Sequence, residues 1–152
     1  MAKGTVFLLA RHSDWGKSQT LKALTGGNHH PRRISITGTK SGVTREFFIK
    51  RSSNGDDVEK YWDFAKKETH DWLIAAFSSD ADAAHILEYL AERYTIYCFV
   101  LEHCYSHPEE AIPQDELAAM QKYAARVSVY SPRKAAADTR AAAFCAFIEA
   151  ET

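Results

Sequence analysis

Three short apolar runs constrain the fold of this chain more than any other feature. They are VFLLA at residues 6–10, WLIAAF at residues 72–77 and YTIYCFVL at residues 94–101. Each run is apolar almost without interruption, which is typical of a strand that is buried on both faces inside a parallel sheet. Segments with apolar residues at helical spacing lie between the runs. This alternation predicts an α/β chain in which helices cover both faces of a mainly parallel sheet.

Residues 32–51 interrupt the alternation with two β-rich runs around a turn that contains glycine and serine, which predicts an antiparallel hairpin. The hairpin strands are expected at residues 33–37 and 45–51, and a last short strand at residues 127–130. Helices are expected at residues 16–24, 58–67, 81–93, 114–125 and 132–149. The predicted fold is therefore a three-layer α/β/α sandwich with an added hairpin, formed as a single domain over residues 1–152.

Composition and charge exclude several classes of protein. The 152 residues are 45% apolar and 26% charged with a formal net charge of −1, so no overall field draws the chain to nucleic acid or to an anionic membrane. The three cysteines form no C-x-x-C pair, which favours free thiols. The apolar run near the N-terminus is too short for a signal peptide or a membrane span. A cytoplasmic protein without a membrane partner is expected.

The segment that follows the first apolar run, RHSDWGKSQT at residues 11–20, has the residue types of an anion site. It leads from the carboxyl end of a predicted strand into a helix, where backbone N–H groups and the helix dipole favour a negative charge. Gly16 allows the backbone to approach a phosphate, Lys17 supplies a cation and Ser18 offers a hydroxyl to Mg²⁺. An early glycine would complete the pattern G-x-x-x-x-G-K-[ST], but Arg11 stands in its place.

RHSDWGKSQT resembles the Walker A loop of P-loop NTPases, and the order of strands and helices is similar to that of their small kinase-like and GTPase-like members. The resemblance implies that Lys17 and Ser18 contact the phosphates and Mg²⁺ of a bound nucleotide such as ATP. It also implies that the backbone around them wraps the phosphates. The binding residues expected on this basis are Ser13, Asp14, Trp15, Gly16, Lys17, Ser18 and Gln19.

Other expected features of that superfamily are irregular here. Asp80 follows the run WLIAAF by two residues more than a metal-side carboxylate usually does, and it is either a displaced carboxylate of that kind or the N-cap of the next helix. Arginines of the hairpin, Arg51 among them, could stabilise charge on a transferred phosphoryl group or could simply be exposed. The catalytic candidates are thus Lys17, Asp80 and Arg51.

Two further segments have both a functional and a structural interpretation. In VYSPRK, Tyr130 and Arg133 could contact a base or ribose, as the same resemblance implies, or Ser131 and Pro132 could simply begin the last helix. The segment HCYSH at residues 103–107 lacks a fourth ligand at zinc-like spacing.

Three functions remain open from the sequence. The first is binding of a nucleotide or other polyphosphate with Mg²⁺, with phosphoryl transfer or slow NTP hydrolysis as the reaction class. The second is a degenerate P-loop fold that serves as a protein-interaction module without catalysis. The third is nucleic-acid binding through the basic hairpin. Whether the chain is an enzyme is not decided by these residues.

Overall fold

A computed structural model describes residues 3–11, 17–26, 32–103, 112–132 and 135–152. These residues form a six-stranded sheet with strand order β2-β3-β4-β1-β5-β6. Only β2 and β3 pair in antiparallel fashion, and the other neighbouring strands are parallel. The strands are β1 (Gly4–Ala10), β2 (Arg33–Thr37), β3 (Thr44–Lys50), β4 (Trp72–Phe77), β5 (Tyr94–Leu101) and β6 (Arg126–Tyr130). The predicted α/β class and the antiparallel hairpin are confirmed.

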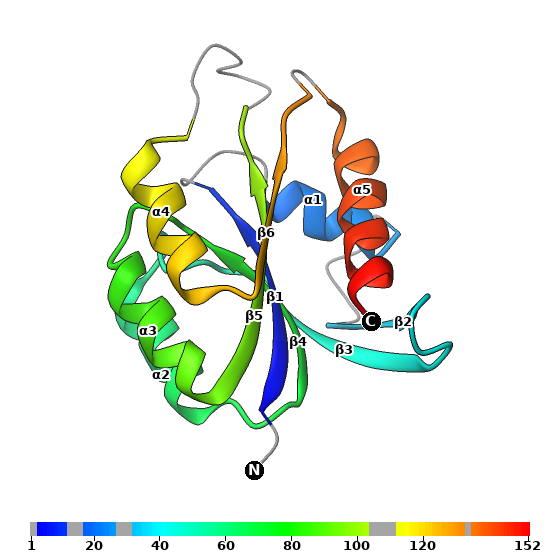
Figure 1. Ribbon diagram of the computed structural model, residues 1–152, viewed down its shortest axis with the longest axis horizontal. Helices are drawn as coiled ribbons and strands as arrows, with labels where there is room; N and C mark the ends of the chain where they lie inside the picture. The colour runs from blue at the N-terminus through cyan, green and yellow to red at the C-terminus, as the bar shows by residue number, and fades with distance from the viewer. Residues whose placement is uncertain (1–2, 12–16, 27–31, 104–111, 133–134) are drawn as a thin grey trace.

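Helices cover both faces of the sheet (Figure 1). The helices are α1 (Lys17–Leu24), α2 (Val58–Lys67), α3 (Ala83–Arg93), α4 (Gln114–Tyr123) and α5 (Ala137–Glu151). The central strand β1 shows how the two faces are filled, because its side chains alternate between two cores. Val6 and Leu8 pack with α2, α3 and α4, whereas Phe7 and Leu9 pack with α1 and α5.

The register of the central strands follows from their apolar sequence. β1 pairs with β4 from Thr5 beside Trp72 to Ala10 beside Phe77, and with β5 on its other side. Both faces of these strands are covered, so nearly every side chain in them is buried. The carboxyl ends of β1 and β4 consequently lie next to each other at one edge of the sheet.

Capping residues explain where α2 begins and where α1 ends. Asp57 is the N-cap of α2 and accepts a hydrogen bond from the backbone N–H of Lys60 at 3.0 Å. Gly26 follows α1 with φ of +74°, a backbone conformation that glycine adopts without steric cost. Within α2, Tyr61 and Ala65 are buried, whereas Val58 in the first turn is exposed.

The starts of α3 and α5 differ from the sequence prediction. The N-cap of α3 is Asp82 with φ of 55°, so the interpretation of Asp80 as the N-cap is wrong. α5 begins at Ala137, five residues later than the predicted start at residue 132. Ser131 does not cap that helix, because its hydroxyl donates instead to Glu102 Oε2 at 2.6 Å. Among the described residues no helix is long and apolar enough to cross a membrane.

Candidate functional site

The carboxyl ends of β1 and β4 meet at a point where the chain leaves the sheet in opposite directions. After β1 the chain continues to α1, which packs on the face shared with α5, whereas after β4 it continues to α3 on the other face. In open α/β sheets a switch of this kind opens a crevice outside the carboxyl ends of the strands, and ligands bind there. The segment RHSDWGKSQT begins at this edge.

Lys17 is the first residue of α1, and its side chain is turned inward at this edge. Its Nζ donates to the backbone oxygen of Arg11 at 2.7 Å and to Ser78 Oγ at 3.4 Å, so the ammonium links the ends of β1 and β4. The side chain is buried, with 5% of the residue exposed. The lysine therefore lies at the carboxyl edge, as its position in the sequence predicted, and the switch point places it beside both strands.

Two more cations are buried at the same edge. Arg11 directly follows β1 and is 1% exposed. Arg140 lies in the first turn of α5, and its Nε donates to Thr20 Oγ1 of α1 at 2.9 Å. Within the part of the chain that the structure describes, the charged residues classed as buried are Arg11, Lys17 and Arg140, and all three are positive. These three side chains are thus largely withdrawn from water, and electrostatic interactions are stronger in such a place.

The turn before α2 fixes the end of β4 from the other side. The amide of Asn54 donates to the backbone oxygens of Ser78 and Ala81 at 2.8 and 2.6 Å, and its Oδ1 accepts from the N–H of Ser78 at 2.6 Å. Ser53 Oγ lies 3.0 Å from Ser78 Oγ. Since Ser78 also contacts Lys17, these hydrogen bonds join the turn, β4 and α1 into one polar cluster.

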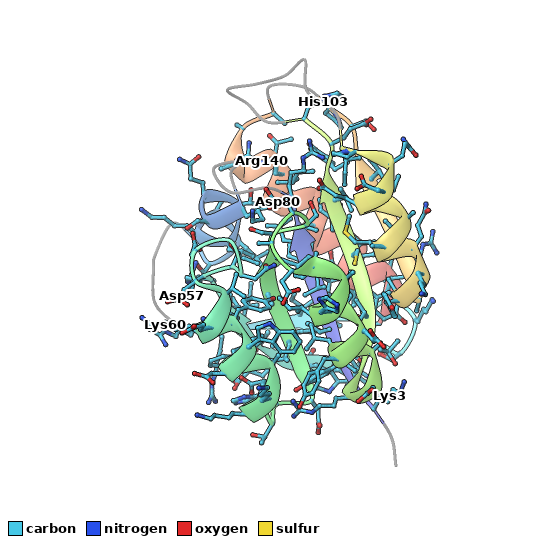
Figure 2. The ribbon with its side chains drawn as sticks, turned by 90° about the vertical axis from the view of Figure 1, so that its left-hand side faces the viewer. Lys3, Asp57, Lys60, Asp80, His103 and Arg140 are labelled. Carbon is cyan, nitrogen blue, oxygen red and sulfur yellow. The ribbon has the colours of Figure 1, made fainter. Side chains whose placement is uncertain are left out.

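Carboxylates lie at the exposed side of this edge. Asp80 is exposed, and Figure 2 shows it at the same end of the molecule as Arg140 and His103, with Lys3 at the opposite end. Glu116 of α4 accepts a hydrogen bond from Ser79 Oγ at 2.6 Å. No group of three potential metal ligands is found among the described residues.

Ser18 and Gln19 are exposed in the first turn of α1. An exposed hydroxyl beside the buried Lys17 is available to a ligand or to a hydrated metal ion. The remaining predicted contacts, Ser13, Asp14, Trp15, Gly16 and Arg133, lie outside the described residues. Tyr130, the other aromatic residue considered near a base, packs its ring against Phe99 with the ring centres 5.5 Å apart.

The arginines of the basic hairpin have different surroundings. Arg33 pairs with Glu46 at 3.0 Å, and the guanidinium of Arg45 lies over the Trp72 ring at 4.4 Å. Arg51 lies at the carboxyl end of β3, close to α1, where its Nη2 donates to Thr25 Oγ1 at 2.9 Å. Burial lowers the pKa of the Arg51 guanidinium, and the charge of Arg32 lowers it further. This hydrogen bond connects Arg51 to the end of the helix that begins with Lys17.

Sequence reasoning missed Arg140, Ser53 and Asn54 as parts of the site. Arg140 had one visible signal, because it shares a helical face with Phe144 and Ile148, which are both buried. An arginine on such a face is expected near buried polar groups rather than in solvent. Ser53 and Asn54 had no signal, since SSNG is common in plain turns and only the tertiary fold brings it to β4.

Comparisons of this chain with protein-family models, with curated proteins and with solved structures found no match. The functional inference therefore depends on the residues described above.

Proposed function

We propose that the carboxyl edge of β1 and β4 binds a polyphosphate group, carried by a nucleotide such as ATP together with Mg²⁺. The observation that carries this proposal is the gathering of three buried cations, Arg11, Lys17 and Arg140, at that edge. Polyphosphate concentrates several negative charges in a small volume, and the start of α1 adds the positive end of a helix dipole. The position at a topological switch point supports the same conclusion.

The contacts of Lys17 indicate how a phosphate would enter. The hydrogen bond to the Arg11 carbonyl is short, whereas the contact with Ser78 Oγ is long at 3.4 Å. We expect a phosphate oxygen to replace the Ser78 contact while the Arg11 contact keeps the ammonium in place. An ammonium held in this way needs little reorganisation when the ligand binds, which favours affinity.

We expect Mg²⁺ to bind with the phosphate at the exposed side of the edge. The hydroxyl of Ser18 and the carboxylate of Asp80 would hold it together with phosphate oxygens, and the ion would neutralise phosphate charge when bound. Phosphoryl transfer or slow NTP hydrolysis is the reaction class that such a site supports. In either reaction Arg51 is the candidate for stabilising charge on the transferred group.

A thermal unfolding experiment tests the binding. ATP, GTP and inorganic tripolyphosphate, each with Mg²⁺, should raise the Tm, because a ligand at 100 times its Kd adds about 2.7 kcal/mol to the free energy of unfolding. Replacing Lys17 by Met should abolish this rise, since it removes the cation at the start of α1. Release of inorganic phosphate, measured with and without the substitution Asp80→Asn, tests turnover.

Lys22→Met is the matched control, because Lys22 lies in the last turn of the same helix and the change removes the same charge. It should leave the rise in Tm unchanged. Arg140→Lys provides a second variant that keeps the charge and loses the planar donor group of arginine. If neither the nucleotides nor tripolyphosphate at millimolar concentration raise the Tm of the unaltered chain, the proposal is wrong.

A second candidate, binding of single-stranded nucleic acid, is favoured by one cationic patch. Arg32 and Lys60 lie near Lys50 where β3 leads toward α2, and Arg51 lies near Arg32. Burial lowers the pKa of Lys50 and the charges of Arg32 and Lys60 lower it further, whereas the nearby carboxylates of Asp56 and Asp57 raise it. If this patch binds a nucleic-acid backbone, affinity for an oligonucleotide should fall steeply with salt and with Arg32→Gln. A salt-independent or absent interaction would exclude this candidate.

A further inference from the structure

The outer surface of α2 and α3 carries an open groove of about 470 Å³, on the helical face that Figure 2 turns toward the viewer. Trp62 of α2 lines one side. His85, Glu88, Tyr89 and Glu92 line the other, and their spacing places them on one face of α3. Asp82, the N-cap of α3, closes one end.

Two aromatic rings form the apolar part of this groove. The rings of Trp62 and Tyr89 meet edge to face, with centres 5.6 Å apart and planes at 72°. Both residues are half-buried, because they also pack against the core beneath. The indole is held in position, since its Nε1–H donates to Asp82 Oδ2 at 3.0 Å. The groove therefore presents fixed aromatic surface to a ligand.

The charged groups of the groove are mainly acidic. Asp82, Glu88 and Glu92 are all exposed, and Asp82 also accepts a hydrogen bond from His85 Nδ1 when that nitrogen is protonated, over 2.6 Å. One cation of the chain already uses the aromatic surface, because Lys66 Nζ lies 5.8 Å from the centre of the Trp62 ring. Aromatic faces beside carboxylates attract ammonium and guanidinium groups through the ring quadrupole and through charge.

We propose that this groove docks a basic segment of a partner protein, which places a lysine or arginine side chain against Trp62 and Tyr89 and pairs further cations with Glu88 and Glu92. Charge complementarity selects this occupant. An acidic segment, a nucleic acid or an anionic membrane would bring like charges toward the three carboxylates, which is unfavourable. The proposal is independent of any ligand at the carboxyl edge of β1 and β4, since none of the groove residues belongs to that polar cluster.

An NMR titration tests the proposal with a defined probe. The indole N–H signal of Trp62, assigned by its loss in Trp62→Phe, is followed at pH 8 and low salt. An acetylated and amidated peptide of sequence Gly-Lys-Arg-Lys-Gly is added. The signal should shift and saturate with a Kd on the order of 0.1–1 mM, because one cation–π contact and exposed ion pairs are individually weak. The peptide Gly-Glu-Gln-Glu-Gly should cause no saturable shift.

Charge variants show whether the groove itself binds. Glu88→Gln with Glu92→Gln should weaken binding of the basic peptide at least 5-fold. Lys66→Gln should strengthen it about 2- to 5-fold, since the competing cation no longer lies beside the indole. The matched control, Glu46→Gln with Asp115→Asn, removes the same charge from exposed positions on β3 and α4 and should leave the Kd within 2-fold.

Each other outcome overturns the proposal. Absence of a saturable shift of the Trp62 signal means that the groove does not bind a basic segment. An equal loss of affinity in the control pair means that general attraction to an acidic surface explains the binding. An unchanged Kd after Glu88→Gln with Glu92→Gln means that the peptide binds elsewhere.

Discussion

Asn54 shows how a single buried amide can hold two elements in position. It is fully buried, and its side chain makes three hydrogen bonds to the backbone of residues 78 and 81. A buried amide is costly unless its polar atoms are paired, so this arrangement is stable only while the turn and the end of β4 stay together. The residue thereby fixes Ser78, which in turn contacts Lys17.

Replacing Asn54 by Ala should destabilise the fold by about 2–4 kcal/mol. The substitution leaves the buried N–H and carbonyl of Ser78 and the half-buried carbonyl of Ala81 without this partner. Each unsatisfied buried group costs about 1–3 kcal/mol. Urea unfolding measures the change. Ser52→Ala is the control, because the hydroxyl of Ser52 only accepts from Lys50 Nζ at the exposed surface. A loss below 1 kcal/mol for Asn54→Ala would mean that water replaces the amide without penalty.

The start of α3 illustrates an element whose first turn is fixed by side chains rather than by a backbone cap. The side chain of Asp82 makes no capping hydrogen bond, and its carboxylate instead contacts Trp62 and His85. The hydrogen bond and the charge of Asp82 raise the pKa of His85, and the charge of Glu88 adds to this. The same hydrogen bonds, from His85 and then Trp62, lower the pKa of Asp82.

The pKa of His85 in the folded chain should therefore exceed 6.5, and an NMR titration of the histidine ring protons measures it. Asp82→Asn should bring it back toward that value, because asparagine tolerates the backbone of residue 82 and lacks the charge. Since the pKa is raised on folding, the pair stabilises the fold below pH 6.5. That contribution is lost as the pH rises through the folded-state pKa. A folded-state pKa at or below 6.5 would contradict the described contact.

Several elements were predictable to the residue, although β1 begins at Gly4, two residues before the predicted run at residues 6–10. The predicted strands at 33–37, 72–77 and 94–101 and the helix at 58–67 coincide with β2, β4, β5 and α2. The starts of α3 and α5 were not predictable to the residue, because more than one polar residue precedes each of these helices and could cap it. Local sequence cannot choose between Asp80 and Asp82, since the choice depends on Trp62, which lies in α2.

At the scale of the whole molecule, the candidate site was also predictable only where local sequence determines it. The position of Lys17 at the carboxyl edge was predictable from local sequence, because GKS follows a buried strand and begins a helix. Backbone N–H groups at such a junction favour an anion. Arg140 and Asn54 were not predictable, since they lie far from Lys17 in the sequence and only the strand order brings their elements to the same edge. The sequence predicted a parallel sheet but not that β1 would lie between β4 and β5.

The two halves of the sequence are also joined at the hairpin, where the turn after β2 packs against the C-terminal residues. The N–H of Thr39 donates to the oxygen of Glu149 at 2.9 Å, and the N–H of Ser41 donates to the oxygen of Thr152 at 3.1 Å. A Cβ on Gly38 would lie 2.2 Å from the carbonyl carbon of Thr152. Glycine is therefore required at position 38 by the approach of another backbone segment.

Gly38→Ala should cost about 1–3 kcal/mol of the free energy of unfolding, because the methyl group forces the turn and residue 152 apart. A double-mutant cycle in urea isolates this cause. In a chain that ends at Glu151 the clashing atoms are gone, so the same substitution should cost much less there.

Gly42→Ala is the matched control: its φ of +69° makes alanine strained, but no atom lies within 4 Å of the added Cβ. Its cost should be the same with and without Thr152. Equal costs of Gly38→Ala in both chains would show that residue 152 does not pack against the turn.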